Sequence, residues 1–135
     1  MRTSTDNQPV GLHVEIHGTE DDRLDAAVRA ALSACGVGEG HVAVAAVGPD
    51  EIRRLNREHR DRDAATDVLS FPVDLAGPAA GPRELGDVVV CPPLCDDLVE
   101  AVVHGVLHLC GHDHETDSGE MLELQDRVMG GLGSG

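Results

Sequence analysis

Lysine, tryptophan and tyrosine are absent from this chain of 135 residues, and Phe71 is its only phenylalanine. Proteins that bind single-stranded nucleic acid by stacking need aromatic platforms, so that mode of binding is excluded. The ten basic residues are all arginine and stand against 25 acidic residues, which makes the formal charge −15. Because so acidic a protein repels polyanions, it cannot coat nucleic acid through its general surface, and any contact with a polyanion needs a local site.

Long hydrophobic runs are also missing. No stretch approaches the roughly 20 apolar residues of a transmembrane helix, and the N-terminus lacks the apolar centre of a signal peptide. The four cysteines form no CxxC pair, a pattern typical of proteins in a reducing compartment. We therefore expect a cytoplasmic protein with no membrane partner. The length predicts one domain over residues 1–135, with loose tails at 1–9 and 130–135.

Hydrophobic periodicity predicts the order strand, helix, strand, helix, two strands and two helices. We expect Thr19 and Asp22 to cap the first helix and Gly36 to end it. The order favours an α+β fold, with helices packed on one small mixed sheet of about four strands and a metal site at the end of a buried helix. The predicted strands are 12–17, 42–47, 67–71 and 85–91, the helices are 24–35, 49–59, 94–110 and 118–129, and residues 73–83 form an exposed loop.

Histidines gather in one segment, HGVLHLCGHDH, at residues 104–114. His104 and His108 are four residues apart, so on a helix their rings share a face and can hold one metal ion. Gly111 can adopt the left-handed conformation that ends a helix, which would let the chain bring His114 back to the same ion. If only this pair of histidines were present, ordinary core or surface side chains without a metal would be the favoured interpretation. The third histidine and the glycine favour a three-histidine site with an open position, typical of catalytic zinc.

The spacing of these histidines is also that of the metzincin proteases, HExxHxxGxxH. In that motif a glutamate beside the first histidine is the general base, but Gly105 stands there in this chain. If this chain were a protease of that class, its general base would be missing. A three-histidine metal can still lower the pKa of a bound water to near 7 and polarise a phosphoryl oxygen, which suits phosphodiester hydrolysis.

Residues 53–62 hold five of the ten arginines, interleaved with carboxylates. Spacing alone favours a solvated, ion-paired helix end there. Other polar residues are candidates for supporting roles. They are His59 and His112 as proton carriers, Asp113 as a residue that orients a ligand histidine or caps the helix, and Asp67 and Asp87 as cleft residues at strand ends.

Three segments of the chain resemble the YbeY family of metal-dependent endoribonucleases. They are LNREHRDRDAATDVLSFP at 55–72, LGDVVVC at 85–91 and the histidine segment at 104–114. The resemblance implies that His104, His108 and His114 bind one zinc ion and that Arg60 contacts an RNA phosphate. It also implies cleavage of single-stranded RNA in maturation of the small-subunit ribosomal RNA 3′ end and in ribosome quality control.

The chain departs from this family in two places: the stretch from Asp87 to His104 is shorter, and His59 stands where tyrosine is usual. Two alternatives to the endoribonuclease stay open, another zinc hydrolase and a non-catalytic, metal-stabilised ribosome assembly factor. Because the negative charge repels RNA, we expect a basic partner such as a ribosomal protein to bring the RNA close. We expect no DNA substrate.

Overall fold

The computed structural model describes residues 12–72, 84–112 and 119–133. Within these residues the chain forms four strands and four α-helices, so the expected α+β class is confirmed. The predicted N-terminal tail and the loop at 73–83 lie outside the described residues. In chain order the elements are β1 (Leu12–His17), α1 (Arg23–Ala34), β2 (Gly40–Ala46), α2 (Pro49–Arg60), β3 (Val68–Pro72), β4 (Glu84–Val90), a 3₁₀ turn (Pro92–Leu94), α3 (Leu98–Leu109) and α4 (Glu120–Gly133).

The sheet is mixed, with the strand order β1-β2-β4-β3. Strands β1, β2 and β4 are parallel, and β3 runs antiparallel to β4. This topology leaves β3 at one edge of the sheet. Gly86 of β4 needs its positive φ of 137° and its missing side chain, because a Cβ there would stand 2.5 Å from the carbonyl oxygen of Phe71 on β3.

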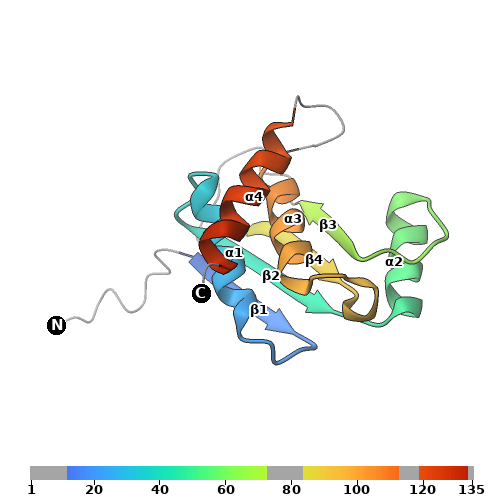
Figure 1. The fold of residues 1–135 in the computed structure, drawn as a ribbon. Coiled ribbons are helices and arrows are strands. Elements are labelled where there is room, and N and C mark those ends of the chain that lie inside the picture. The colour runs from blue at the N-terminus through green and yellow to red at the C-terminus, as the bar shows by residue number, and fades with distance from the viewer. Residues whose placement is uncertain (1–11, 73–83, 113–118, 134–135) are drawn as a thin grey trace, which may run out of the picture.

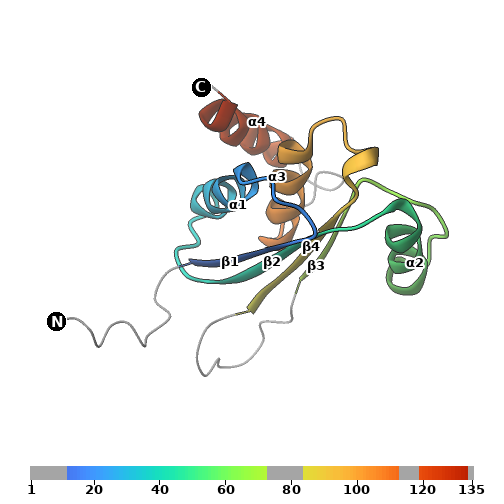
Figure 2. The same ribbon diagram turned by 90° about the horizontal axis from the view of Figure 1, so that it is seen from below.

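Helices α1, α3 and α4 lie over one face of the sheet, and α2 lies apart from them (Figures 1 and 2). Alternate side chains of the inner strands point into the layer beneath α1 and α3, where they meet the apolar faces of those helices. A smaller cluster joins α2 to the other face of β3 and β4. The larger core includes Leu24, Val28, Leu32, Val42, Val44, Val88, Val90, Val102, Val106 and Leu107, and the smaller one Ile52, Leu69, Val89 and Cys91.

Helix α3 starts later than its apolar pattern predicts. The expected start at Leu94 is wrong, because Leu94 lies in the 3₁₀ turn and is 44% exposed. The helix begins after Asp97, whose carboxylate accepts a hydrogen bond of 3.2 Å from the backbone N–H of Glu100. An acidic N-cap with glutamate three residues later is a helix-start signal, and here it outweighs the apolar residues before it.

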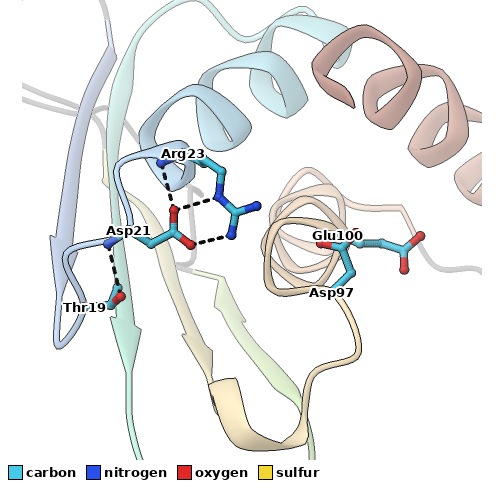
Figure 3. Close-up of polar contacts among 5 residues, drawn as sticks. All are labelled: Thr19, Asp21, Arg23, Asp97 and Glu100. Atoms are coloured by element: carbon cyan, nitrogen blue, oxygen red, sulfur yellow. Dashed lines mark hydrogen bonds and ion pairs between the residues drawn. The ribbon is translucent and has the colours of Figure 1, made fainter. Parts of the chain in front are cut away.

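The start of α1 also differs from the expectation. Asp22 occupies the N-cap position, but its side chain makes no cap hydrogen bond. The side chain of Asp21 instead accepts a hydrogen bond of 3.0 Å from the backbone N–H of Arg23, the first residue of the helix. The hydroxyl of Thr19 accepts from the backbone N–H of Asp21 (Figure 3). Gly36 follows the helix with a φ of 77°, as predicted.

Helix α4 runs to Gly133, four residues beyond the end predicted from its apolar periodicity at residue 129. The described part of the C-terminal glycine-rich segment is thus helical. None of the helices within the described residues is long and apolar enough to cross a membrane.

Candidate metal and phosphate site

A cleft of about 630 Å³ lies beside the edge strand β3. Its walls come from α2 and the loop after it, from β3, from the 3₁₀ turn and the residues that lead into α3, and from α3 with one residue of α4. It is lined by Asn56, Arg60, Arg62, Thr66, Asp67, Val68, Leu69, Ser70, Pro72, Leu94, Asp96, Asp97, Glu100, Ala101, His104, His108 and Gln125. Residues far apart in the sequence therefore share one solvent-accessible hollow.

The two histidines of α3 converge in this cleft. The Nε2 atoms of His104 and His108 are 3.2 Å apart, and the two rings meet edge to face. Two nitrogens that ligate one tetrahedral zinc at about 2.0–2.1 Å stand about 3.3–3.4 Å apart. The spacing of this donor pair thus fits one zinc ion without a rearrangement of α3.

The third predicted ligand, His114, and its neighbour Asp113 lie outside the described residues. Within the residues that are described, no three His, Cys, Asp or Glu side chains come close enough to hold a metal. The three-histidine set therefore stays a prediction, of which the structure positions two members.

The end of α3 has the geometry that the prediction requires of Gly111. Its φ is 98°, its N–H bonds the carbonyl of His108 at 3.0 Å, and the N–H of His112 bonds the carbonyl of Leu107 at 3.1 Å. This pair of bonds is the Schellman motif, in which a left-handed glycine ends a helix and turns the chain away from the axis. The expected helix break at Gly111 is confirmed.

Gly105 leaves no room for a side chain beside His104. A Cβ there would stand 2.7 Å from Cγ1 of Val88 and 3.0 Å from Cγ2 of Val68, because this side of α3 packs directly on the sheet. The position that carries the glutamate base in metzincins is buried against β3 and β4 here. The packing therefore gives a reason why that residue is glycine, and it disfavours the protease alternative.

Tertiary contacts distinguish the arginines of α2 from one another. Arg53 and Arg57 form ion pairs with Asp63, and Arg54 pairs with two glutamates of its own helix. Arg60 instead lines the cleft and donates from Nη1 to the carbonyl oxygen of Ser70 at 3.4 Å. The predicted ion-paired helix end is thus confirmed for these three arginines, whereas Arg60 reaches the cleft that the histidines line.

Ser70 connects the two halves of the cleft. Its hydroxyl donates to the carbonyl of Gly105 at 2.8 Å, and its own carbonyl accepts from Arg60. Ser70 is buried, so both contacts are made by a fixed residue of β3. The guanidinium of Arg60 and the histidines of α3 are therefore positioned by one shared strand.

Sequence reasoning missed Gln125 of α4 and Glu100 of α3. The side-chain oxygen of Gln125 lies 2.7 Å from Nδ1 of His104, and its amide nitrogen donates to Glu100 at 3.4 Å. One signal was present in the sequence. Gln125 is the polar residue on the face of α4 that buries Met121 and Val128, and a buried polar side chain normally has a specific partner.

The remaining candidates fall in different places. Asp67 lines the cleft. His59 packs edge to face on Phe71 with ring centroids 5.2 Å apart, and it does not line the cleft. His112 lies beside the thiol of Cys35, whose pKa is lowered to about 7, chiefly by a hydrogen bond with Cys110 and also by His112. Asp87 is exposed on β4 and is not part of the cleft wall.

Carboxylates outnumber arginines in the described wall of the cleft. Asp67, Asp96, Asp97 and Glu100 line it with Arg60 and Arg62. Arg23 does not offset this charge, because Asp21 pairs with its guanidinium on the side of α1 that faces the start of α3 (Figure 3). This pairing with Arg23 lowers the pKa of Asp21 to about 2. A bound divalent cation would offset part of the remaining negative charge.

Comparison with known proteins identifies the family of this chain. The model of the family "Endoribonuclease YbeY" matches residues 13–133. An endoribonuclease YbeY of Koribacter versatilis is 36% identical over 129 residues, which cover 87% of this chain and 80% of that protein. One of Halorhodospira halophila is 38% identical over 130 residues and 84% of each chain.

The same family name recurs at higher identity over a shorter span. An endoribonuclease YbeY of Rubrobacter xylanophilus is 47% identical over 93 residues, covering 67% of this chain and 66% of that protein. The solution structure of a Thermotoga maritima protein has a similar fold, with a TM-score of 0.55 and 27% identity over 90% of this chain and 89% of the other. This chain therefore belongs to the YbeY family of endoribonucleases.

Proposed function

We propose that this protein is a zinc-dependent endoribonuclease that cleaves single-stranded RNA during maturation of the small-subunit ribosomal RNA 3′ end and in ribosome quality control. The observation that carries the proposal is the shared cleft, in which the paired Nε2 atoms of His104 and His108 and the guanidinium of Arg60 lie along one edge strand. Membership of the endoribonuclease family supports the RNA-cleaving part of this proposal.

The metal-binding residues in this proposal are His104, His108 and His114, and they would hold one zinc ion. Zinc, when bound, would supply a Lewis acid for the phosphate and an activated water. The chain itself supplies the orientation of two ligands, because α3 fixes both imidazoles on one face, and the Schellman turn at Gly111 ends the helix before the third.

Arg60 is the residue that we assign to the phosphate. A guanidinium offers parallel N–H groups that match two phosphate oxygens, and it stays charged at every physiological pH. The bond of Arg60 to Ser70 is long at 3.4 Å, and its partner is an uncharged carbonyl. The guanidinium can therefore exchange this contact for a charged phosphate at little cost.

We further propose that the protein acts in the cytoplasm and that a basic partner, such as a ribosomal protein, helps to deliver the RNA. The support is electrostatic. The net charge is −15, and carboxylates outnumber arginines in the described cleft wall. Long-range repulsion between such a surface and RNA slows encounter unless a cation or a basic protein offsets it.

The proposal is tested with purified protein, zinc and three substrates: a single-stranded RNA with the small-subunit 3′ end sequence, the same RNA as a duplex, and casein. We expect internal cleavage of the single strand, weaker cleavage of the duplex, no proteolysis, and loss of cleavage when a chelator removes the metal. Proteolysis would favour the other zinc hydrolase. Zinc binding without any cleavage would favour the non-catalytic assembly factor.

The ligand set is tested by metal analysis of two variants. His114→Ala should lose the zinc, because it removes one of three ligands, whereas His112→Ala should retain it. The two histidines lie in the same short segment, so each variant is the matched control of the other. Zinc retained in His114→Ala and lost in His112→Ala would overturn the ligand assignment.

A further inference from the structure

We infer that Gln125 is a positioning residue that holds the His104 imidazole in its metal-binding tautomer. Glu100, Gln125 and His104 form a row of hydrogen bonds, and Glu100 sets the direction in which these bonds are donated. The inference rests on the proposed zinc function for its biological meaning. Its structural content, the location of one proton on His104, is independent of whether the protein cleaves RNA.

The hydrogen bonds from Glu100 through Gln125 to His104 cross between α3 and α4. Gln125 of α4 is 9% exposed, and its side-chain oxygen lies 2.7 Å from Nδ1 of His104 on α3. Its amide nitrogen lies 3.4 Å from Oε2 of Glu100, one turn before His104 on the same helix. A buried amide with a partner at each end has only one orientation that satisfies both.

The direction of the chain follows from what each group can donate. An ionised carboxylate only accepts hydrogen bonds, so the group of Gln125 that faces Glu100 must be its NH₂. The carbonyl oxygen of Gln125 then faces His104, and a carbonyl also only accepts. The proton between them must therefore be on Nδ1 of His104, which makes Nδ1 the donor.

This assignment determines the chemistry of the other ring nitrogen. A neutral imidazole carries one proton, so with Nδ1 protonated the Nε2 of His104 presents its lone pair. That atom lies 3.2 Å from Nε2 of His108, in the position expected of a metal donor pair. Histidine ligands usually donate their other N–H to a nearby acceptor, and loss of that acceptor lowers metal affinity about 10–100-fold.

The first experiment measures the tautomer without metal. Nitrogen-15 NMR of the histidine rings, in protein freed of metal by a chelator and held at about pH 8.5 where histidine is neutral, reports which nitrogen of His104 is protonated. We expect protonated Nδ1 in the native chain. In Gln125→Met, which has a similar volume and no acceptor of comparable strength, we expect a mixture or the opposite tautomer. An unchanged Nδ1 proton in Gln125→Met would overturn the inference.

The second experiment exchanges the two polar residues. The double variant Glu100→Gln with Gln125→Glu keeps the direction of the chain, because the new amide donates to the new carboxylate, which accepts from His104. We expect zinc affinity, measured by competition with a chromogenic chelator, to fall about 10–100-fold in Gln125→Met and to recover in the exchange variant. Equal zinc affinity in Gln125→Met and the native chain would contradict the inference.

Two controls make these outcomes specific. Glu123→Gln changes an exposed position of α4 and should leave both the tautomer and the zinc affinity unchanged. If Gln125→Met fails to fold by circular dichroism, Gln125→Asn, which stays polar but is too short to reach His104, replaces it with the same expected results. If the native chain binds no zinc, the proposed function fails, and the tautomer in the metal-free protein still decides the role of Gln125.

Discussion

Arg60 differs from the other arginines of α2 in what its guanidinium contacts. Arg53 and Arg57 are exposed and Arg54 is partly exposed, and all three are paired with carboxylates. Solvent screens ion pairs of this kind, so they contribute little to stability. Arg60 contacts an uncharged carbonyl in the histidine cleft. At the residue scale, the contact partner therefore distinguishes the three ion-paired arginines from Arg60, the arginine that we assign to the phosphate.

Arg60→Ala should leave folding and zinc content unchanged and lower the rate of RNA cleavage by about 10²-fold or more, the scale of losing one donor that stabilises transition-state charge. Arg53→Ala is the matched control on the same helix and should change the rate little. Cleavage assays at constant salt, with metal content verified, make the comparison. Equal rates for the two variants would refute the phosphate assignment.

Gly105 shows how closely α3 approaches the sheet. Both of its nearest neighbours are branched valine side chains, and Val88 is fully buried. Overpacking of such a core costs about 1–3 kcal/mol, while alanine in place of glycine within a helix contributes about 1 kcal/mol in the opposite direction. At the element scale, the close packing outweighs the helix preference.

Gly105→Ala should therefore lower the free energy of unfolding by about 1 kcal/mol. Gly130→Ala is the matched control, because Gly130 is also helical and no atom lies within 4 Å of its added Cβ. It should raise the free energy of unfolding by about 0.5–1 kcal/mol. Urea unfolding of the three proteins measures both effects. Stabilisation by both substitutions would show that α3 can shift away from the sheet without cost.

The net charge of −15 acts on the whole molecule, but its effect on RNA depends on where each charge lies. Asp96→Asn removes a carboxylate from the cleft wall, and Asp126→Asn removes one from an exposed part of α4 outside that wall. We expect Asp96→Asn to lower the KM for single-stranded RNA about 1.4–5-fold, equivalent to the 0.2–1 kcal/mol of an exposed charge interaction. Asp126→Asn should change it less.

Salt provides the check on this comparison. Higher ionic strength screens exposed charges, so the difference in KM between the two variants should shrink as salt is added. Equal KM values at low salt would mean that total charge, rather than the charge of the cleft, controls binding of RNA.

His41 links three strands of the sheet and makes stability depend on pH. Its Nδ1 lies 2.9 Å from Glu84 of β4, and its Nε2 forms an ion pair of 3.0 Å with Glu15 of β1. The hydrogen bond to Glu84 is the largest cause of a raised His41 pKa. A raised pKa in the folded state means that the stabilisation is complete below the unfolded value of 6.5 and is lost as pH rises through the folded value.

His41→Gln should therefore lower the free energy of unfolding more at about pH 6 than at about pH 9. Glu15, whose pKa is lowered by His17 and His41, is ionised at both values and does not reverse this sign. Denaturant unfolding at the two pH values gives the measurement, with His13→Gln on the exposed side of β1 as the control. The same loss at both pH values would show that His41 is not charged in the fold.

The sequence by itself determined what depends on neighbours along the chain. The strand alternation, the four-residue spacing of His104 and His108 and the helix break at Gly111 are local, because backbone periodicity and glycine conformation act within a few residues. Where two local signals competed the prediction was wrong, as at Leu94, where the cap at Asp97 outweighed the apolar pattern.

Only the tertiary structure decided which polar side chains meet at the site. Gln125 contacts His104 across 21 residues of sequence, and Ser70 contacts Gly105 across 35. Arg60 is ten residues from Ser70 and is distinguished from its neighbours only by the position of β3. Hydrogen bonds and close packing act over a few ångströms between elements, so these contacts exist only once the helices have packed on the sheet and on one another.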